Sequence, residues 1–147
     1  MRSVSGKAVD SSGSDTQPSD TAADALADEW HALMTRYHRT ACVLDRELQT
    51  RHDLSVSEFE ILQQLFNAGD GCGSVRMQEL ANEVHLTQSA LSRLISRLER
   101  DGLVGRASCT EDRRSVYVTI TDAGSERFLT ARPTQRAVLR EQAATPA

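Results

Sequence analysis

The sequence predicts a mainly α-helical fold with one small β-hairpin. Two observations carry this prediction. Apolar residues recur every three or four positions through most of the chain after residue 22, which is the period of amphipathic helices. Between residues 115 and 120 the spacing changes to alternation, which is the period of a strand. A chain of 147 residues suits one domain, which we place at residues 22–147.

Charge is distributed unevenly along the chain. The net charge is −4, and the first 29 residues account for all of it, with two basic and six acidic side chains. Residues 1–21 are also rich in Ser, Asp and Gly and poor in apolar residues, so we expect a disordered acidic tail. Since the remainder is neutral, the acidic balance does not argue against a nucleic-acid partner.

Several classes of protein are disfavoured. No apolar run approaches the roughly 18 residues that a membrane-spanning helix needs, and the N-terminus has no signal-peptide core. We therefore expect a cytoplasmic protein without membrane contact. The three cysteines show no CxxC spacing and the histidines no ligand pattern, so we expect no metal and no cofactor. No nucleophile–base pair or phosphate loop stands out, so we expect no enzyme and no catalytic residue.

The first predicted helix covers residues 22–51. Its apolar side chains step by three or four and form a heptad-like stripe. The stripe consists of Trp30, Leu33, Tyr37, Ala41, Leu44 and Leu48. Such a stripe can pack into the chain's own core, against a partner helix, or both.

Capping signals place the next helices. Ser55 and Glu58 have the spacing of a capping box and open a second helix, which ends at the glycine-rich segment 67–74. A third helix is expected at about 77–84. Its apolar side chains recur at helical spacing, and a short turn follows it.

The fourth predicted helix, residues 87–101, has two unlike faces. Thr87 has the place of its N-cap, and one face is apolar. The other face offers hydroxyl, amide and guanidinium groups, with no carboxylate before Glu99. Two short helices separated by a tight turn form a helix-turn-helix, and these polar groups suit the major groove of DNA.

Residues 103–120 read as a hairpin that follows the fourth helix. Between its strands lies a polar turn that contains Asp112, Arg113 and Arg114. An arginine held at the tip of such a wing suits a narrow minor groove, whereas in isolation these charges would satisfy each other in solvent. Thr121 has the place of an N-cap for a fifth helix, which we expect Pro133 to disturb.

These residues together resemble the MarR family of bacterial transcription regulators. The matching positions are Gln78, Leu80, Ala81, Ser89, Leu91, Ser92, Arg93, Leu94, Leu98, Glu99, Gly102, Leu103, Val104, Arg106, Asp112, Arg113, Arg114, Val118, Ile120, Thr121 and Gly124. The resemblance implies a winged-helix homodimer that binds pseudo-palindromic operators and often represses a gene until a small ligand binds or a cysteine is oxidised. It also implies a DNA-binding lobe at about 55–121.

The resemblance further implies a dimerisation lobe at residues 22–51 and 122–147. Family members usually carry one more helix after the fifth, and we expect that helix to be missing here. The dimer is then expected to rely on the stripe of the first helix and on the fifth helix.

The expected DNA-binding residues are Thr87, Gln88, Ser89, Ser92, Arg93, Arg97, Asp112, Arg113 and Arg114. The resemblance also places a ligand pocket beside the dimer helices. Its candidates are Trp30, Tyr37, His38, Phe59 and Leu62, for which ordinary packing is the alternative. Cys109 lies among arginines, which favour a reactive thiolate, and is a redox candidate; the alternative is an incidental thiol.

The sequence therefore predicts a sequence-specific regulator of transcription, acting as a repressor on double-stranded DNA. Its recognition helix is expected at 87–101 and its wing at 103–120. The alternative is a winged-helix module that binds a protein partner and has no specific DNA site.

Overall fold

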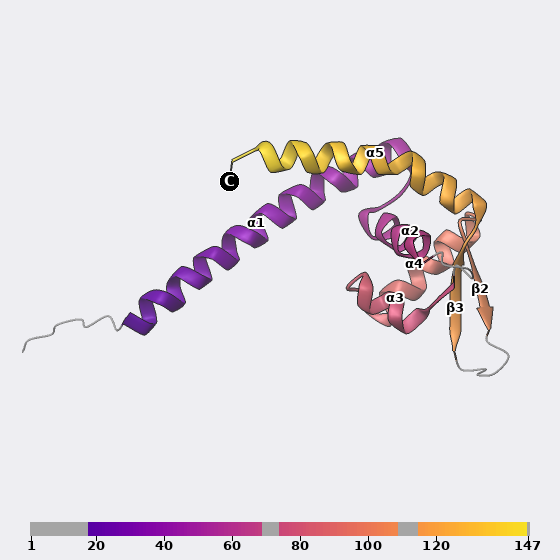
Figure 1. Ribbon diagram of the computed structural model, residues 1–147, viewed down its shortest axis with the longest axis horizontal. Coiled ribbons are helices and arrows are strands. Elements are labelled where there is room, and N and C mark those ends of the chain that lie inside the picture. The colour runs from indigo at the N-terminus through magenta and orange to yellow at the C-terminus, as the bar shows by residue number, and fades with distance from the viewer. Residues whose placement is uncertain (1–17, 69–73, 109–114, 147) are drawn as a thin grey trace, which may run out of the picture. The chain divides into compact units, whose positions relative to one another are not determined.

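A computed structural model describes residues 18–68, 74–108 and 115–146 (Figure 1). It confirms a mainly helical chain with a small antiparallel sheet. The elements in chain order are α1 Pro18–His52, α2 Val56–Asn67, β1 Ser74–Arg76, α3 Met77–Glu83, α4 Gln88–Arg100, β2 Val104–Ser108, β3 Val116–Ile120 and α5 Asp122–Ala144. By internal contacts the chain divides after Thr35, so residues 18–35 and the remainder are described separately.

The sheet has three strands, one more than the sequence predicts. Its order is β1-β3-β2, with Val118 of β3 opposite both Val75 of β1 and Arg106 of β2. β1 spans only three residues at the edge of the segment expected to be a glycine loop. A strand this short shows no alternation, and its pairing partner lies far along the chain, so no local pattern predicts it.

The core lies where α2, α4, α5 and the sheet meet. Phe128 of α5 is its aromatic centre, with ring centroids 5.3 Å from Phe59 and 4.9 Å from Phe66. The fully buried side chains around it come from every large element of residues 36–146. They include Leu48, Leu62, Leu65, Leu80, Leu91, Ile95 and Val118. This core supports the buried face of α4 and so fixes which face of that helix meets solvent.

The capping box at the start of α2 is confirmed. Ser55 Oγ accepts a hydrogen bond from Glu58 N at 3.1 Å, and Glu58 Oε2 accepts one from Ser55 N at 2.8 Å. Asp45 Oδ1 of α1 accepts a further bond from Val56 N at 3.0 Å. Two free N–H groups at the helix start are thus satisfied by carboxylates, one of them from α1.

α5 begins against the base of the β2–β3 hairpin. Thr121 Oγ1 accepts from Gly124 N at 3.1 Å and donates to the Gly102 carbonyl at 2.6 Å. A Cβ on Gly124 would lie 2.0 Å from the carbonyl oxygen of Leu103, so only glycine fits there.

The prediction that Pro133 disturbs the fifth helix is wrong, because α5 continues through Pro133 from Asp122 to Ala144. Pro133 is exposed. The carbonyl that its missing N–H leaves unpaired can therefore be solvated, and the helix tolerates the loss.

The apolar stripe of α1 divides into two parts. Leu44 and Leu48 are buried in the core, whereas Trp30, Leu33 and Tyr37 are 63%, 51% and 63% exposed. Leu26, one turn before the stripe, is 66% exposed. Cys42, beside the stripe, is also exposed. Among the described residues, no helix is both long enough and apolar enough to cross a membrane.

Candidate nucleic-acid interface

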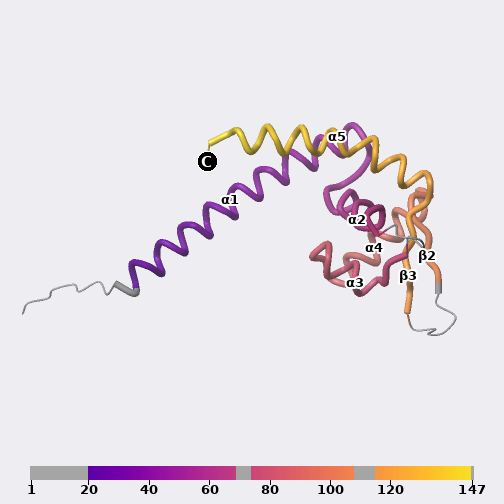
Figure 2. The backbone as a smooth tube through the Cα atoms, in the orientation of Figure 1, coloured from indigo at the N-terminus to yellow at the C-terminus, as the bar shows by residue number. Residues whose placement is uncertain are grey.

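α3 and α4 form a helix-turn-helix (Figure 2). The connection turns at His85, whose φ of 56° lies in the left-handed region, and Leu86 N closes it by bonding to the Ala81 carbonyl at 3.0 Å. Thr87 Oγ1 then caps α4 by accepting from Ala90 N at 3.2 Å. The expected N-cap is therefore present, and α4 begins in a fixed direction.

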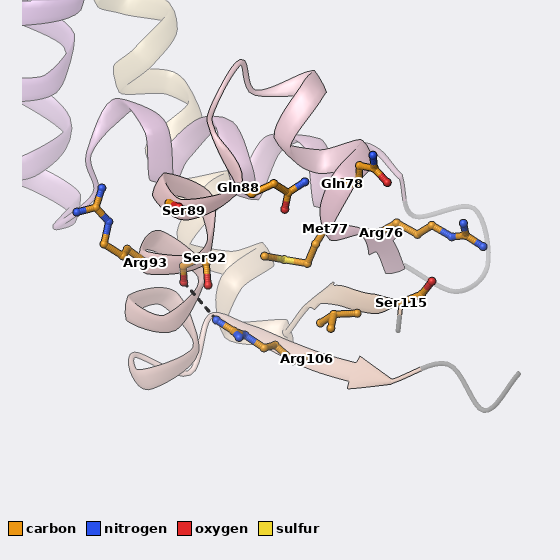
Figure 3. A pocket seen from close by; sticks show the side chains of 10 residues that line it. Arg76, Met77, Gln78, Gln88, Ser89, Ser92, Arg93, Arg106 and Ser115 are labelled. Carbon is orange, nitrogen blue, oxygen red and sulfur yellow. Dashed lines mark hydrogen bonds between the residues drawn. The ribbon is translucent and has the colours of Figure 1, made fainter. Parts of the chain in front are cut away.

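The polar face of α4 borders an open groove of about 1010 Å³ (Figure 3). α3, α4 and all three strands contribute to its wall. The lining residues are Arg76, Met77, Gln78, Gln88, Ser89, Ser92, Arg93, Arg106, Ser115 and Val116. We call this the arginine groove, because the described residues lining it include three arginines and no carboxylate. Such a lining attracts phosphate and offers donors and acceptors to base edges.

Arg106 fastens strand β2 to the recognition helix α4. Its Nη2 donates to the Ser92 carbonyl at 3.2 Å and to Ser96 Oγ at 2.8 Å, and its Nε lies 4.0 Å from Glu99 Oε1. Figure 3 shows Arg106 directed at Ser92 across the arginine groove. The wing and the recognition helix are therefore joined through side-chain contacts as well as through the chain.

Arg76 places a cation at the other end of the arginine groove from Arg93 (Figure 3). Its Nε donates to the Tyr117 hydroxyl at 2.9 Å, and its guanidinium carbon lies 5.6 Å from the centroid of the Tyr117 ring. Sequence reasoning missed this residue. Arg76 belongs to the unpredicted strand β1, and the register that pairs it with Tyr117 is not visible in the sequence.

Four of the predicted DNA-binding residues line the arginine groove: Gln88, Ser89, Ser92 and Arg93. Thr87 is exposed at the helix start. Asp112, Arg113, Arg114 and the redox candidate Cys109 lie outside the described residues.

Arg97 does not line the arginine groove. Its Nε lies 3.2 Å from Glu58 Oε1, and its Nη2 lies 3.7 Å from Asp53 Oδ1. The Glu58 side chain is 1% exposed, while that of Arg97 is 41% exposed. The guanidinium is thus directed toward the start of α2.

The five candidates for a ligand pocket occupy unlike environments. Phe59 and Leu62 are fully buried, whereas Trp30, Tyr37 and His38 are exposed. Tyr37 and His38 contact each other edge to face, with centroids 5.5 Å apart. Ordinary packing, the alternative for these residues, describes Phe59 and Leu62 but not the three exposed side chains within this chain.

A second pocket lies elsewhere, between the end of α1 and the start of α5. It has a volume of about 630 Å³ and is lined by residues that include Arg51, His52, Asp101 and Arg127. His52 Nε2 lies 2.7 Å from Thr134 Oγ1, and the His52 carbonyl accepts from Arg127 at 3.0 Å. Burial lowers the pKa of His52 from 6.5, and the charges of Arg51 and Arg127 lower it further. In the part of the chain that the structure describes, no cluster of His, Cys, Asp and Glu could hold a metal ion.

Comparison with known proteins finds a family match over part of the chain. Residues 54–116 match the model of the MarR family. The HTH-type transcriptional repressor YetL of Bacillus subtilis is 36% identical over 75 residues, which are 51% of this chain and 44% of YetL. The chain spans between 44% and 63% of the length of the first curated relatives it matches.

Solved structures agree with the family match. Sco3205, a MarR family transcriptional regulator from Streptomyces coelicolor in complex with DNA, superposes with a TM-score of 0.71 at 29% identity, covering 77% of this chain and 70% of that one. The transcriptional regulator BldR from Sulfolobus solfataricus superposes with a TM-score of 0.74 at 27% identity, covering 89% and 88%. Residues 54–116 of this chain therefore resemble the MarR family in sequence, and the chain resembles a solved MarR-family regulator in fold.

Proposed function

We propose that the protein is a transcriptional regulator that binds double-stranded DNA at a specific sequence. The observation that carries this proposal is the arginine groove, where the recognition helix and the wing strands jointly present cations without a carboxylate among the described lining residues. Cation-rich surfaces bind the phosphate backbone, and polar side chains on a protruding helix face distinguish bases. The relatives, which are transcription regulators, support the same proposal.

In this proposal α4 enters the major groove with its first turns. Gln88 and Ser89 lie at the start of α4, where free N–H groups and the positive end of the helix dipole favour a nearby phosphate. Ser92, one turn further along, is then a candidate for base contact, and Arg93 is a candidate for contact with both a base edge and the neighbouring phosphate. A bidentate contact between an arginine and guanine contributes about 1–3 kcal/mol of discrimination.

Contacts outside α4 would fix the protein on the DNA backbone. Arg76, oriented by Tyr117, is a candidate for a phosphate contact at one end of the arginine groove. The hairpin of β2 and β3 would bring Arg113 and Arg114 to the adjacent minor groove, as predicted from the sequence. Arg106 would hold that hairpin at a constant angle to α4.

We also propose a homodimer that binds two half-sites about one helical turn apart. The apolar side chains left exposed on α1 favour a second copy. Leu129 and Leu139 of α5, each 41% exposed, extend the apolar surface available to it. Sedimentation at micromolar concentration is expected to give a dimer, and Tyr37→Glu to shift it toward the monomer. A wild-type monomer would remove this part of the proposal.

Repression and its release remain predictions. The relative YetL is named a repressor, which supports that sign of regulation for this chain. Release by a small molecule would use a cavity completed by the second copy, since Trp30, Tyr37 and His38 are exposed in the single chain. Release by oxidation would use Cys109. Equal operator binding by the wild type and Cys109→Ser under peroxide would exclude the oxidation route.

Selection of bound duplexes from a random DNA pool tests the proposed function directly. The full chain is expected to enrich one sequence arranged as an inverted repeat. Retention of the pool without enrichment of any sequence would instead favour the alternative, a winged-helix module that binds a protein partner. The domain boundaries at residues 22–147 imply that a chain without residues 1–21 enriches the same duplex.

A further inference from the structure

We propose that Arg97 is a positioning residue of the DNA-binding domain rather than a DNA contact. In this role its ion pair with the buried Glu58 fixes the recognition helix α4 against the start of α2. The inference rests on the proposed DNA binding and deepens it, because it separates two arginines of the same helix that the sequence alone assigns to one surface.

The two carboxylate oxygens of Glu58 have different surroundings. One carboxylate oxygen, Oε2, is used by the capping box. The other, Oε1, is buried and has no hydrogen-bond partner of regular geometry among the described residues. A buried carboxylate oxygen with neither a hydrogen bond nor a charge nearby is strongly destabilising. Arg97 Nε, at 3.2 Å, supplies the compensating charge.

The guanidinium of Arg97 is directed at two carboxylates. Two of its nitrogens face carboxylates, Nε toward Glu58 and Nη2 toward Asp53 at 3.7 Å. Asp53 lies between α1 and α2 and has a φ of 53°, so it belongs to the tight connection that follows α1. Arg97 thus ties α4 to two neighbouring parts of the chain, while Arg93, one turn earlier, lines the arginine groove.

The two roles predict different salt dependence. Each phosphate contact releases counterions and adds about 0.9 to the slope of log affinity against log salt concentration. Removing a phosphate contact therefore lowers that slope by about one. Removing a positioning residue tilts or loosens α4, so affinity falls while the slope is retained.

A double-mutant cycle on the full chain distinguishes these roles. The proteins are the wild type, Glu58→Gln, Arg97→Gln and the double variant, with Arg93→Gln as a matched control on the same helix. The probe is the duplex enriched from the random pool. Binding is measured over a series of salt concentrations, and thermal unfolding of each protein is measured beside it.

Arg97→Gln is expected to weaken binding about tenfold with an unchanged salt slope, a coupling of the size seen between residues in contact. In the Glu58→Gln background the same substitution is expected to add almost nothing. Arg93→Gln is expected to lower both affinity and slope. If Arg97→Gln unfolds at the binding temperature, the salt slopes of Glu58→Gln and of the double variant are compared instead, because loss of a direct phosphate contact would still lower the slope by about one.

The inference is overturned if Arg97→Gln lowers the slope by about one and weakens binding equally in both backgrounds, because that is the behaviour of a direct phosphate contact. Undiminished affinity of Arg97→Gln also overturns it. Failure of the proposed function looks different, since no duplex is then enriched by the wild type. In that case the unfolding cycle still reports whether Glu58 and Arg97 are coupled.

Discussion

His52 is a side chain whose ionisation affects stability near neutral pH. Its pKa is lowered by burial and by Arg51 and Arg127, below the ordinary value of 6.5. As the pH falls, the unfolded chain therefore binds the proton before the folded one. The contribution of His52 to the free energy of unfolding is then fully present above about pH 6.5 and is lost as the pH falls below it.

The midpoint temperature of thermal unfolding is accordingly expected to decrease as the pH is lowered from about 7.5 to about 5.5. In His52→Gln the decrease is expected to be smaller. His31→Gln, which alters an exposed histidine of α1 outside the apolar stripe and the candidate ligand pocket, is the control. Parallel curves for the wild type and His52→Gln would contradict the assignment.

Among the glycines that the structure describes, Gly124 is the one at which substitution by alanine should be most destabilising. An added methyl group would overlap the Leu103 carbonyl oxygen at 2.0 Å and approach the Ile120 side chain at 2.8 Å. Because the first neighbour is backbone, relief requires α5 to move away from the hairpin. Gly124→Ala is expected to lower the free energy of unfolding by about 3 kcal/mol in denaturant titrations.

Gly105 is the matched control for that substitution. A Cβ there would meet only Thr119 Oγ1, at 3.4 Å, which is an ordinary contact. Gly105→Ala should therefore change the free energy of unfolding by less than about 1 kcal/mol. Equal effects of the two substitutions would mean that the contact between α5 and the hairpin is not close.

At the scale of an element, the start of α4 depends on one side chain. Thr87 is expected from the sequence to contact DNA, and in the structure its hydroxyl oxygen accepts from Ala90 N. Thr87→Ala is therefore expected to destabilise the fold by about 1 kcal/mol, while Thr87→Ser keeps the cap and most of the stability. Urea titration measures both. If Thr87→Ala loses DNA affinity without losing stability, while Thr87→Ser keeps both, the hydroxyl acts on DNA and not on the helix.

Sequence patterns within a few residues predicted most helices and strands, but they did not predict contacts between residues far apart in the chain. The capping box at Ser55 and the N-cap Thr87 are visible in the sequence because their partners lie three residues away. The direction of Arg97 was not predictable, since its position on the helical wheel suits a polar surface and its partner Glu58 reads only as part of a cap. Strand β1 was missed for the same reason, because only its pairing with β3 defines it.

The sequence predicted the residues of the candidate site that lie on α4, but it missed residues that other elements contribute. Gln88, Ser89, Ser92 and Arg93 share one face of a predicted helix, and the structure places all four on the arginine groove. Arg76 and Arg106 join them only through the sheet and its packing on α4. A sequence pattern follows one helix face, whereas a groove is made by several elements.

For the whole molecule, the net charge of −4 says little about its partner. Acidic residues concentrate in the first 29 positions, whereas three arginines line one groove formed by α3, α4 and the sheet. Electrostatic attraction within a Debye length of about 10 Å is set by that local arrangement. The exposed apolar side chains of α1 are the surface that the proposed dimer would cover.

The central claim, that the arginine groove binds DNA phosphates, is tested most directly by the salt dependence of binding. The full chain, Arg76→Gln and Arg93→Gln are titrated with the enriched duplex between about 50 and 200 mM salt. The wild type is expected to lose affinity steeply, and each substitution is expected to lower the slope by about one. A flat salt dependence, or slopes that neither substitution changes, would contradict the claim.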